Sequence, residues 1–403
     1  MYQLVDIDLM LFPFCSVVVL GLSILIFNYV FISPRKYQYL LESPKQYRHN
    51  KRWLSKINNN NPLVKQIDQF CKENDIYANG AIVSLSGGVD SMVTLAILLY
   101  LKTIHNFNIY TATIDYGLRK ESNDETRFLI DYAKFYGIVY NVSYITDVSR
   151  KKENSGTRTD FEERSRDIRF NAYKEIIETN KLNSNVGVFV AHHQDDIIEN
   201  IFTNSMRGGN LLDLEVMKPI SKNREVNIFR PLLQFKKQVI YDFAHEYGIP
   251  YFLDTTPKWS NRGKMRNEIF PLLDDVFGTS WRYNIKNIGT QSNQWGSYIN
   301  QMVLVPLFNQ VELHNTDIKK YIKISVINEQ PDFIYHSVIM NSLHSIGEKM
   351  LKKTSVERII DLIHKNEPKL IPLDGHRSGI FTRDKKYIVI FNQTVCKLSL
   401  NDF

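Results

Sequence analysis

The segment Ser-Gly-Gly-Val-Asp-Ser at residues 86–91 carries the residue types that bind a phosphate. Its glycines let backbone N–H groups approach an anion, and its serines add hydroxyl donors. An apolar run at residues 81–85 precedes it and a helical run at 92–99 follows, so a helix N-terminus adds further donors. An ordinary strand-to-helix turn is the alternative, and no Gly-Lys-Ser/Thr follows as in a Walker loop. The residues predicted to bind phosphate are Ser86, Gly87, Gly88, Val89, Asp90 and Ser91, with Asp90 orienting the loop or holding Mg²⁺.

A second segment, residues 192–199, places two histidines and three carboxylates directly after an apolar run at residues 186–191. Asp196 and Glu199 are three residues apart and share one helix face, where they could bind magnesium or grip an amine. His192 could polarise a substrate carbonyl or contact phosphate. Simple capping by Asp195 is the alternative, but a capping box would need Glu or Gln at position 198, which is Ile. A zinc site would need a different spacing, so we predict a catalytic or substrate-binding role.

Further charged residues follow strand ends or share a helix face. Asp115 and Arg119 come after an apolar run and suit recognition of ribose or phosphate, with a glycine turn carrying solvated charges as the alternative. Arg166 and Arg169 are three residues apart on an expected helix and form a fork suited to phosphate. A solvated helix face is the alternative reading of that pair.

Short apolar runs alternate with helical patterns through the middle of the chain. The expected strands are residues 82–85, 109–114, 139–144 and 186–191, and the expected helices are 91–103, 123–136, 160–179, 195–206 and 236–247. This alternation predicts an α/β fold with a parallel sheet and helices on both faces. Ligands of such sheets bind beyond the carboxyl ends of the strands, so Ser86, Asp115 and His192 should converge there.

The N-terminal region is expected to anchor the chain in a membrane. Residues 9–32 contain no charged side chain, and Arg35, Lys36 and further basic residues follow. That length spans a bilayer, and the basic flank predicts a catalytic region on the cytosolic side. A cleaved signal peptide, a mitochondrial presequence and a buried helix are the alternatives. The expected organisation is an anchor at 1–33, a basic linker at 34–77, a catalytic domain with the phosphate-binding loop at 78–260, and a mostly helical region at 261–403 with a short β segment at 379–391.

Composition narrows the class of protein. The net charge is +7 and the pI is about 9.0, which fits a nucleic-acid ligand or an anionic surface without requiring either. The three cysteines, Cys15, Cys71 and Cys396, form no C-x-x-C pair. A disulfide framework and a cysteine zinc site are therefore not expected, and the chain suits a reducing compartment.

The motifs in this order resemble the tRNA(Ile)-lysidine synthase family of the PP-loop ATP pyrophosphatases. The matching stretches are residues 86–91, 115–119, 166–170, 191–199, 207–209, 230–232 and 254–271. The resemblance implies that ATP adenylates the C2 oxygen of the wobble cytidine in a tRNA(Ile) with a CAU anticodon. The amine of free L-lysine then displaces AMP to give lysidine.

The resemblance also implies roles for single residues. Catalytic roles fall to Asp90, Asp196, Glu199, Arg166 and His192, nucleotide binding to residues 86–91 and Asp115, Mg²⁺ binding to Asp90 and Asp196, and RNA binding to Arg207, Arg262 and Arg266. The chain departs from the family at Tyr116, Asn200, Gly263 and Met265, and the expected membrane anchor is not a family feature. A tRNA thiolase and a catalytically weak, membrane-anchored tRNA-binding protein remain alternatives, and the oligomeric state is open, a homodimer included.

Overall fold

The computed structural model describes residues 51–117, 122–145, 155–252, 260–316, 318–326 and 330–402, and within 155–163 only the backbone. These residues form two compact units. The first contains the described residues up to Gly208 together with Glu215–Asn287, and the second contains Gly209–Leu214 and the described residues from Ile288 onward. Each unit has its own hydrophobic core.

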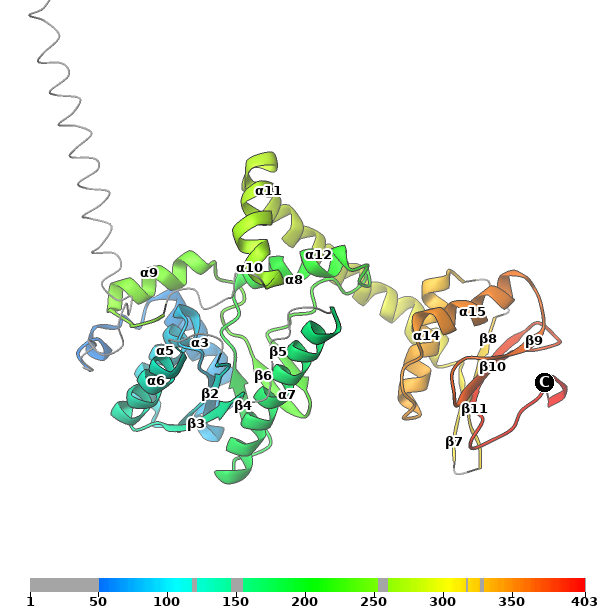
Figure 1. Cartoon of the computed structure of the whole chain (residues 1–403), viewed down its shortest axis with the longest axis horizontal. Helices are drawn as coiled ribbons and strands as arrows, with labels where there is room; N and C mark the ends of the chain where they lie inside the picture. The colour runs from blue at the N-terminus through cyan, green and yellow to red at the C-terminus, as the bar shows by residue number, and fades with distance from the viewer. Residues whose placement is uncertain are drawn as a thin grey trace, which may run out of the picture. The chain divides into compact units, whose positions relative to one another are not determined.

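A six-stranded sheet organises the first unit, in the order β3-β2-β1-β4-β6-β5 (Figure 1). Its strands are β1 (Ala81–Ser84), β2 (Ile109–Asp115), β3 (Val139–Tyr144), β4 (Gly187–Phe189), β5 (Ile220–Asn223) and β6 (Val226–Phe229). All neighbours pair in parallel except β5, which runs antiparallel to β6 at the edge. The predicted α/β fold with a mainly parallel sheet is therefore confirmed. The β5–β6 hairpin was not among the expected strands.

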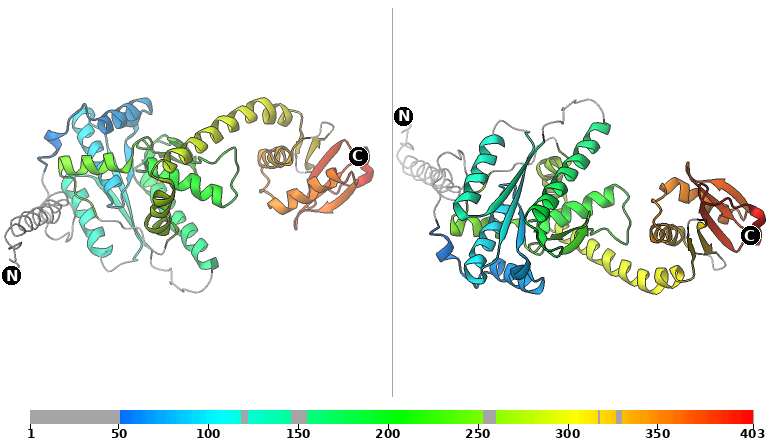
Figure 2. Two further views of the ribbon diagram at one scale, coloured as in Figure 1. Left: turned by 90° about the horizontal axis from the view of Figure 1, so that it is seen from above. Right: turned by 90° about the horizontal axis from the view of Figure 1, so that it is seen from below.

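Helices cover both faces of this sheet, as both views in Figure 2 show. They are α3 (Pro62–Glu73), α5 (Val89–His105), α6 (Ser122–Tyr136), α7 (Ser155–Thr179), α8 (Gln194–Met206) and α9 (Lys237–Tyr247). The alternation of side chains along β1 divides the core: Ala81 and Val83 pack with α3, α5, α6 and α9, whereas Ile82 packs with α7. Helix α5 is apolar almost all round because it is buried in the larger of these two clusters.

The stretch that we expected to be a linker is partly core. Helix α3 begins after Asn61, whose side chain accepts a hydrogen bond from the Leu63 N–H at 2.9 Å, and Pro62 occupies the first helical position. Leu63 and Ile67 are fully buried, and the indole of Trp53 donates to the hydroxyl of Tyr136 at 2.8 Å. The linker prediction is wrong for this stretch, because the amphipathic pattern of α3 is short and the asparagine run beside it resembles a loop.

The second unit combines helices with a sheet that the sequence predicted only in part. Five antiparallel strands form one sheet in the order β7-β8-β11-β10-β9. They are β7 (Glu312–Asn315), β8 (Lys320–Ser325), β9 (Lys369–Pro372), β10 (Arg377–Phe381) and β11 (Tyr387–Asn392). Helices α14 (Asp332–Ser345) and α15 (Lys353–His364) form the main core with it. The expectation of a single short β segment is corrected here. It missed three strands because β7, β8 and β9 are short and rich in lysine and other polar residues.

The remaining elements are short, apart from one long helix. Helix α12 (Trp281–Ile299) is the long one, and the short helices are α4 (Ile76–Asn79), α10 (Asn261–Lys264), α11 (Phe270–Phe277) and α13 (Val305–Phe308). Single π-helical turns lie at Met265–Ile269 and Asn300–Leu304, and 3₁₀ turns at Leu54–Lys56 and Leu400–Asp402. Within the described ranges, no helix is both long and apolar enough to cross a bilayer. The expected anchor at residues 9–32 lies outside those ranges, as do Arg119 and residues 253–259.

Candidate active site

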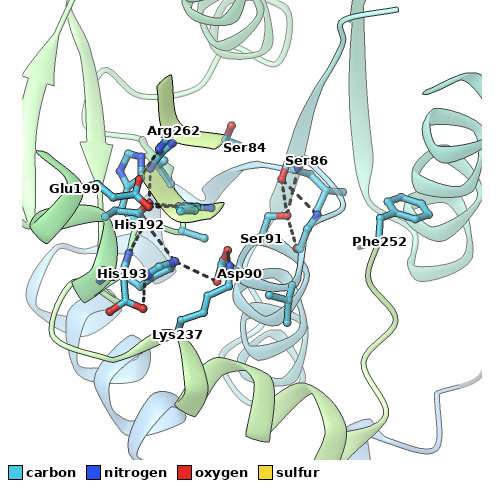
Figure 3. Close-up of a pocket in the computed structure, with 18 of the residues that line it drawn as sticks. Ser84, Ser86, Asp90, Ser91, His192, His193, Glu199, Lys237, Phe252 and Arg262 are labelled. Atoms are coloured by element: carbon cyan, nitrogen blue, oxygen red, sulfur yellow. Dashed lines mark hydrogen bonds and ion pairs between the residues drawn. The ribbon is translucent and has the colours of Figure 1, made fainter. Parts of the chain in front are cut away.

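The glycine-rich loop between β1 and α5 forms one wall of a cavity of about 500 Å³. Gly88 is the N-cap of α5 and supplies no side chain to cap it. The hydroxyl of Ser91 donates to the Gly88 carbonyl at 2.9 Å and lies 3.2 Å from the hydroxyl of Ser86 (Figure 3). The loop therefore presents two adjacent hydroxyls beside a helix N-terminus, which is an arrangement that binds anions.

Gly87 can only be glycine in this loop. Its φ is +80°, and a Cβ there would lie 2.4 Å from the ring of Phe252. The Phe252 N–H donates to the Gly87 carbonyl at 2.9 Å, so the residue that crowds Gly87 also holds the loop in place. A Cβ on Gly88 would meet nothing closer than the Ser86 hydroxyl, at 3.6 Å.

Helix α8 begins one residue earlier than expected. His193 is the N-cap, and its Nδ1 accepts the Asp195 N–H at 3.3 Å. Asp196 completes a capping box, because its Oδ2 accepts the His193 N–H at 3.0 Å. The alternative considered for this segment, capping by Asp195 without a box, is therefore wrong. A histidine and an aspartate take the positions that Ser/Thr and Glu/Gln usually occupy in a capping box.

The carboxylates of Asp196 and Glu199 are buried side by side and paired with two arginines. The Arg262 Nε lies 2.8 Å from Glu199 Oε2, and the Arg266 Nη2 lies 3.2 Å from Asp196 Oδ1. Arg262 also pairs with Asp196, and Arg266 with Glu199. Burial alone would raise the pKa of Asp196, but His193, Arg262 and His192 lower it to about 2. Asp196 is therefore charged at neutral pH. Arg262 and Arg266, which were predicted to face RNA, lie in the cavity wall.

Asp90 faces the same cavity from the first turn of α5. Its Oδ2 accepts from the ammonium of Lys237 at 2.6 Å, and its Oδ1 lies 3.7 Å from His193 Nε2 (Figure 3). Oδ1 is buried and has no hydrogen-bond partner among the described residues. Sequence reasoning missed Lys237. Its signal is a basic residue opening a helix soon after the stretch at residues 230–232.

His192 is held as a neutral imidazole. Its Nδ1 accepts from Arg230 Nε at 3.1 Å, so the ring proton resides on Nε2. Arg230 is fixed in turn by the Lys218 carbonyl and the Ser221 hydroxyl, both at 2.9 Å. Burial lowers the pKa of His192 to about 4, with Arg262 and Arg230 acting in the same direction and Asp196 opposing them. His192 can therefore donate a hydrogen bond into the cavity without carrying charge.

This lowered pKa makes folding stability depend on pH. Between pH 6.5 and about 4, His192 is protonated in the unfolded chain and neutral in the folded one, so stability falls as the pH falls through this window. We expect wild type to lose about 2 kcal/mol more than His192→Gln between about pH 7 and about pH 4.5. Denaturant unfolding of both proteins at the two pH values measures the difference. Equal losses would show that His192 titrates normally in the folded state.

The other predicted residues divide between the cavity and its surroundings. Arg169 lines the cavity, where its Nη2 donates to the Tyr116 hydroxyl at 2.7 Å. Asp115 holds the turn after β2 by accepting from the Gly117 N–H and the Thr126 hydroxyl. Asp115, Arg166 and Arg207 are not among the described residues that line the cavity. Their roles therefore stay predictions.

Hydrogen-bond donors suited to phosphate and an acidic pair both line the cavity. Ser86, Gly88, Val89, Asp90 and Ser91 line one side, and His192, His193, Asp196 and Glu199 line another. All of them follow the carboxyl ends of β1 and β4, which are adjacent in the sheet. The predicted convergence of Ser86 and His192 is thus confirmed. Among the described residues, no cluster of three or more His, Cys, Asp and Glu side chains is arranged to hold a metal ion.

Comparison with known proteins finds one matching family and several similar tRNA(Ile)-lysidine synthases. The PP-loop domain family matches residues 59–273. A tRNA(Ile)-lysidine synthase from Thermosipho africanus is 32% identical over 219 residues, which are 53% of this chain and 48% of that protein. Another from Borreliella afzelii is 27% identical over 328 residues, 80% of this chain and 69% of that protein. One from Chlamydia caviae is 27% identical over 237 residues, 58% of this chain and 70% of that protein.

Among solved structures, the U34-tRNA thiolase NcsA from Methanococcus maripaludis aligns with a TM-score of 0.45 and 17% identity, over 63% of this chain and 84% of that one. The chain spans 48% of the Thermosipho africanus protein and 69% of the Borreliella afzelii protein. The resemblance to tRNA(Ile)-lysidine synthases is confirmed at the level of sequence similarity. Because the family match covers more than half of the sequence and includes the glycine-rich loop and the acidic pair, the chain belongs to the PP-loop family.

Proposed function

We propose that the protein is a tRNA(Ile)-lysidine synthase, a ligase that uses ATP to join free L-lysine to the wobble cytidine of a tRNA. The observation that carries the proposal is the arrangement of one cavity. A phosphate-binding loop lies on one wall and a buried pair of carboxylates, Asp196 and Glu199, on another. A site that activates a base with ATP and then receives an amine needs both.

The loop suits the triphosphate of ATP. The helix N-terminus at Gly88 and the hydroxyls of Ser86 and Ser91 supply donors, and Lys237 adds a positive charge 2.6 Å from Asp90. Asp90 fits a magnesium ion that is bound chiefly by phosphates, because Mg²⁺ typically takes one or two protein carboxylates and keeps several waters. Asp90 lines the cavity together with Ser86 and Ser91, so its carboxylate would be the protein ligand of such an ion. Bound there, Mg²⁺ would neutralise charge on the phosphates.

The proposed reaction has two steps at the same cavity. The C2 oxygen of the cytidine attacks the α-phosphorus of ATP, an O–P bond forms, and pyrophosphate leaves. The neutral amine of lysine then attacks C2, an N–C bond forms, the C2–O bond breaks, and AMP leaves with the oxygen. Lysine arrives as an ammonium group, and the one proton that it must lose before this attack passes to water. Placement of the reactants supplies much of the acceleration in such reactions.

Asp196 and Glu199 are the groups that would hold the lysine side chain as it arrives. Both are buried and each pairs with a guanidinium group, so their oxygens suit a cationic ammonium group. Arg262 and Arg266 already pair with them, so an incoming ammonium must share or displace these guanidinium groups. A displaced arginine would be available to the phosphates of the tRNA, which joins this observation to the RNA-binding prediction for both residues.

The test uses the full-length chain in a mild non-ionic detergent, with labelled ATP, labelled lysine and a tRNA bearing a CAU anticodon. We expect pyrophosphate release together with lysine incorporation into the RNA. The same tRNA with guanosine at the wobble position is the control and should accept no lysine. Release of pyrophosphate without lysine incorporation would indicate another nucleophile, as in a thiolase, and no ATP cleavage would favour a tRNA-binding protein.

We also propose that residues 9–32 anchor the protein in a membrane, with the catalytic unit on the cytosolic side. The support is the uncharged apolar run and the basic residues that follow it. The full-length chain should stay with membranes during alkaline carbonate extraction, whereas a variant lacking residues 1–33 should be released. Truncation must spare Trp53 and Ile57, because both side chains are buried in the core of the first unit. Extraction of the full-length chain would contradict the anchor.

A further inference from the structure

The imidazole of His193 lies between two carboxylates that come from different elements. Its Nε2 is 3.4 Å from Asp196 Oδ2, on α8, and 3.7 Å from Asp90 Oδ1, on α5 (Figure 3). The side chain is only 3% exposed, so water does not screen these approaches. The other ring nitrogen, Nδ1, caps α8.

Capping decides which nitrogen of the ring carries the proton. Nδ1 accepts the Asp195 N–H at 3.3 Å, so in the neutral ring the proton resides on Nε2. The Nε2–H is therefore the donor that faces the two carboxylates. At 3.4 and 3.7 Å neither approach is a hydrogen bond, so the ring acts on both carboxylates through the dipole of its N–H group.

Apart from the His193 ring, Asp196 and Asp90 differ in how many hydrogen-bond and ion-pair partners they have. Asp196 has the Arg262 and Arg266 guanidinium groups and the His193 N–H. Asp90 has Lys237 on Oδ2, whereas its Oδ1 has no hydrogen-bond partner among the described residues. Two buried negative oxygens that approach one group repel each other unless a positive dipole lies between them.

We propose that His193 is a positioning residue that couples the phosphate-binding loop to the acidic pair. Its Nε2–H sets Asp90 relative to Asp196, and thereby sets the ATP side of the cavity relative to the side that receives the amine. The residue contacts neither substrate in this role. The inference rests on the proposed function. Only a site that performs both steps needs the phosphate-binding loop and the acidic pair at a fixed distance from each other.

Two substitutions separate positioning from capping. In His193→Asn the side-chain oxygen can still accept the Asp195 N–H, and Asn is among the best N-cap residues, but nothing reaches the two carboxylates. In His193→Gln the amide nitrogen reaches the place of Nε2 and donates, but no acceptor remains at the place of Nδ1. Positioning predicts that Gln is the better replacement for catalysis and Asn the better replacement for stability.

The rate is measured in single-turnover lysine transfer by the full-length protein, alongside pyrophosphate exchange and thermal unfolding. We expect His193→Asn to keep its melting temperature and to lose at least about tenfold in the rate of transfer, since an ångström of misplacement can lower rates a hundredfold. His193→Gln should melt earlier and transfer lysine faster than His193→Asn. If Asn is the more active of the two, His193 is only a cap and the proposal fails.

A second measurement does not depend on the substrate. The ring nitrogens of His193, followed by nitrogen NMR of the labelled protein, should show the proton on Nε2 at neutral pH. A proton on Nδ1 would overturn the proposal. If wild type transfers no lysine but exchanges pyrophosphate, the proposed function fails alone, and the ranking of the two variants in exchange then decides the role of His193.

Discussion

Replacing Asp196 with Asn is expected to lower the rate of lysine transfer at least about a hundredfold, because one carboxylate of a buried charged pair is worth about 2–5 kcal/mol. Asn keeps the volume and the oxygen that accepts the His193 N–H at 3.0 Å, so helix α8 should still begin at the same residue. In the proposed function the loss would come from the missing negative charge, which would hold the incoming ammonium group. Single-turnover incorporation of labelled lysine into the tRNA measures this rate.

The control for this substitution is Asp131→Asn, which removes the same charge from an exposed position on α6. It should leave lysine transfer within about threefold of wild type, since exposed charges away from a site have small effects. Pyrophosphate exchange by the Asp196 variant should fall less than lysine transfer, because the phosphate-binding loop is untouched. Transfer within threefold of wild type in Asp196→Asn would show that the acidic pair does not hold the amine.

Replacing Gly87 with Ala is expected to lower pyrophosphate exchange at least about thirtyfold and to destabilise the fold by about 2–3 kcal/mol. The new Cβ would lie 2.4 Å from the Phe252 ring, and the φ of +80° is unfavourable for any residue with a Cβ. Both effects push the loop away from the position in which its donors face the cavity. Denaturant unfolding and exchange of labelled pyrophosphate into ATP provide the two measurements.

Two further variants test whether crowding by Phe252 causes the effects of Gly87→Ala. Gly88→Ala should lose only about 1 kcal/mol, the cost of alanine at an N-cap, because its φ is −69° and its Cβ would find the nearest atom at 3.6 Å. Adding Phe252→Ala to Gly87→Ala removes the clash and leaves the backbone penalty of about 1 kcal/mol, although the lost ring has a cost of its own. If Gly87→Ala and Gly88→Ala behave alike, crowding by Phe252 is not what demands glycine here.

The charge balance of the cavity links these expectations. Two arginines match Asp196 and Glu199, and Lys237 matches Asp90, so the acidic groups described here are each compensated. Removing one member of a buried pair leaves its partner uncompensated, which is the more costly arrangement. The Asp196 variant should therefore also change how Arg262 and Arg266 lie, and part of its effect on transfer follows from that.

The sequence pattern predicted those elements and motifs whose residues are neighbours along the chain. The alternation of apolar runs with helical stretches predicted β1, β2, β3 and β4 and the helices between them, and each strand was placed within two residues. The glycine-rich loop and the acidic pair could be recognised because the residues of each motif lie within one short segment of the sequence. The family resemblance follows from the same motifs. Elements with a weak hydrophobic pattern were not predicted. They include α3, the β5–β6 hairpin and three strands of the second unit.

What the sequence by itself determined is therefore the parallel α/β architecture, the phosphate-binding loop and the identity of the acidic pair, since helix caps, strand periodicity and glycine turns act over a few residues. Only the tertiary structure decided which groups face one another across the cavity. Lys237 is 147 residues from Asp90, and Arg262 is 63 residues from Glu199, so no local rule pairs them. The position of His193 between Asp90 and Asp196 likewise depends on β1 and β4 being neighbours in the sheet, because that pairing brings the two helix N-termini together.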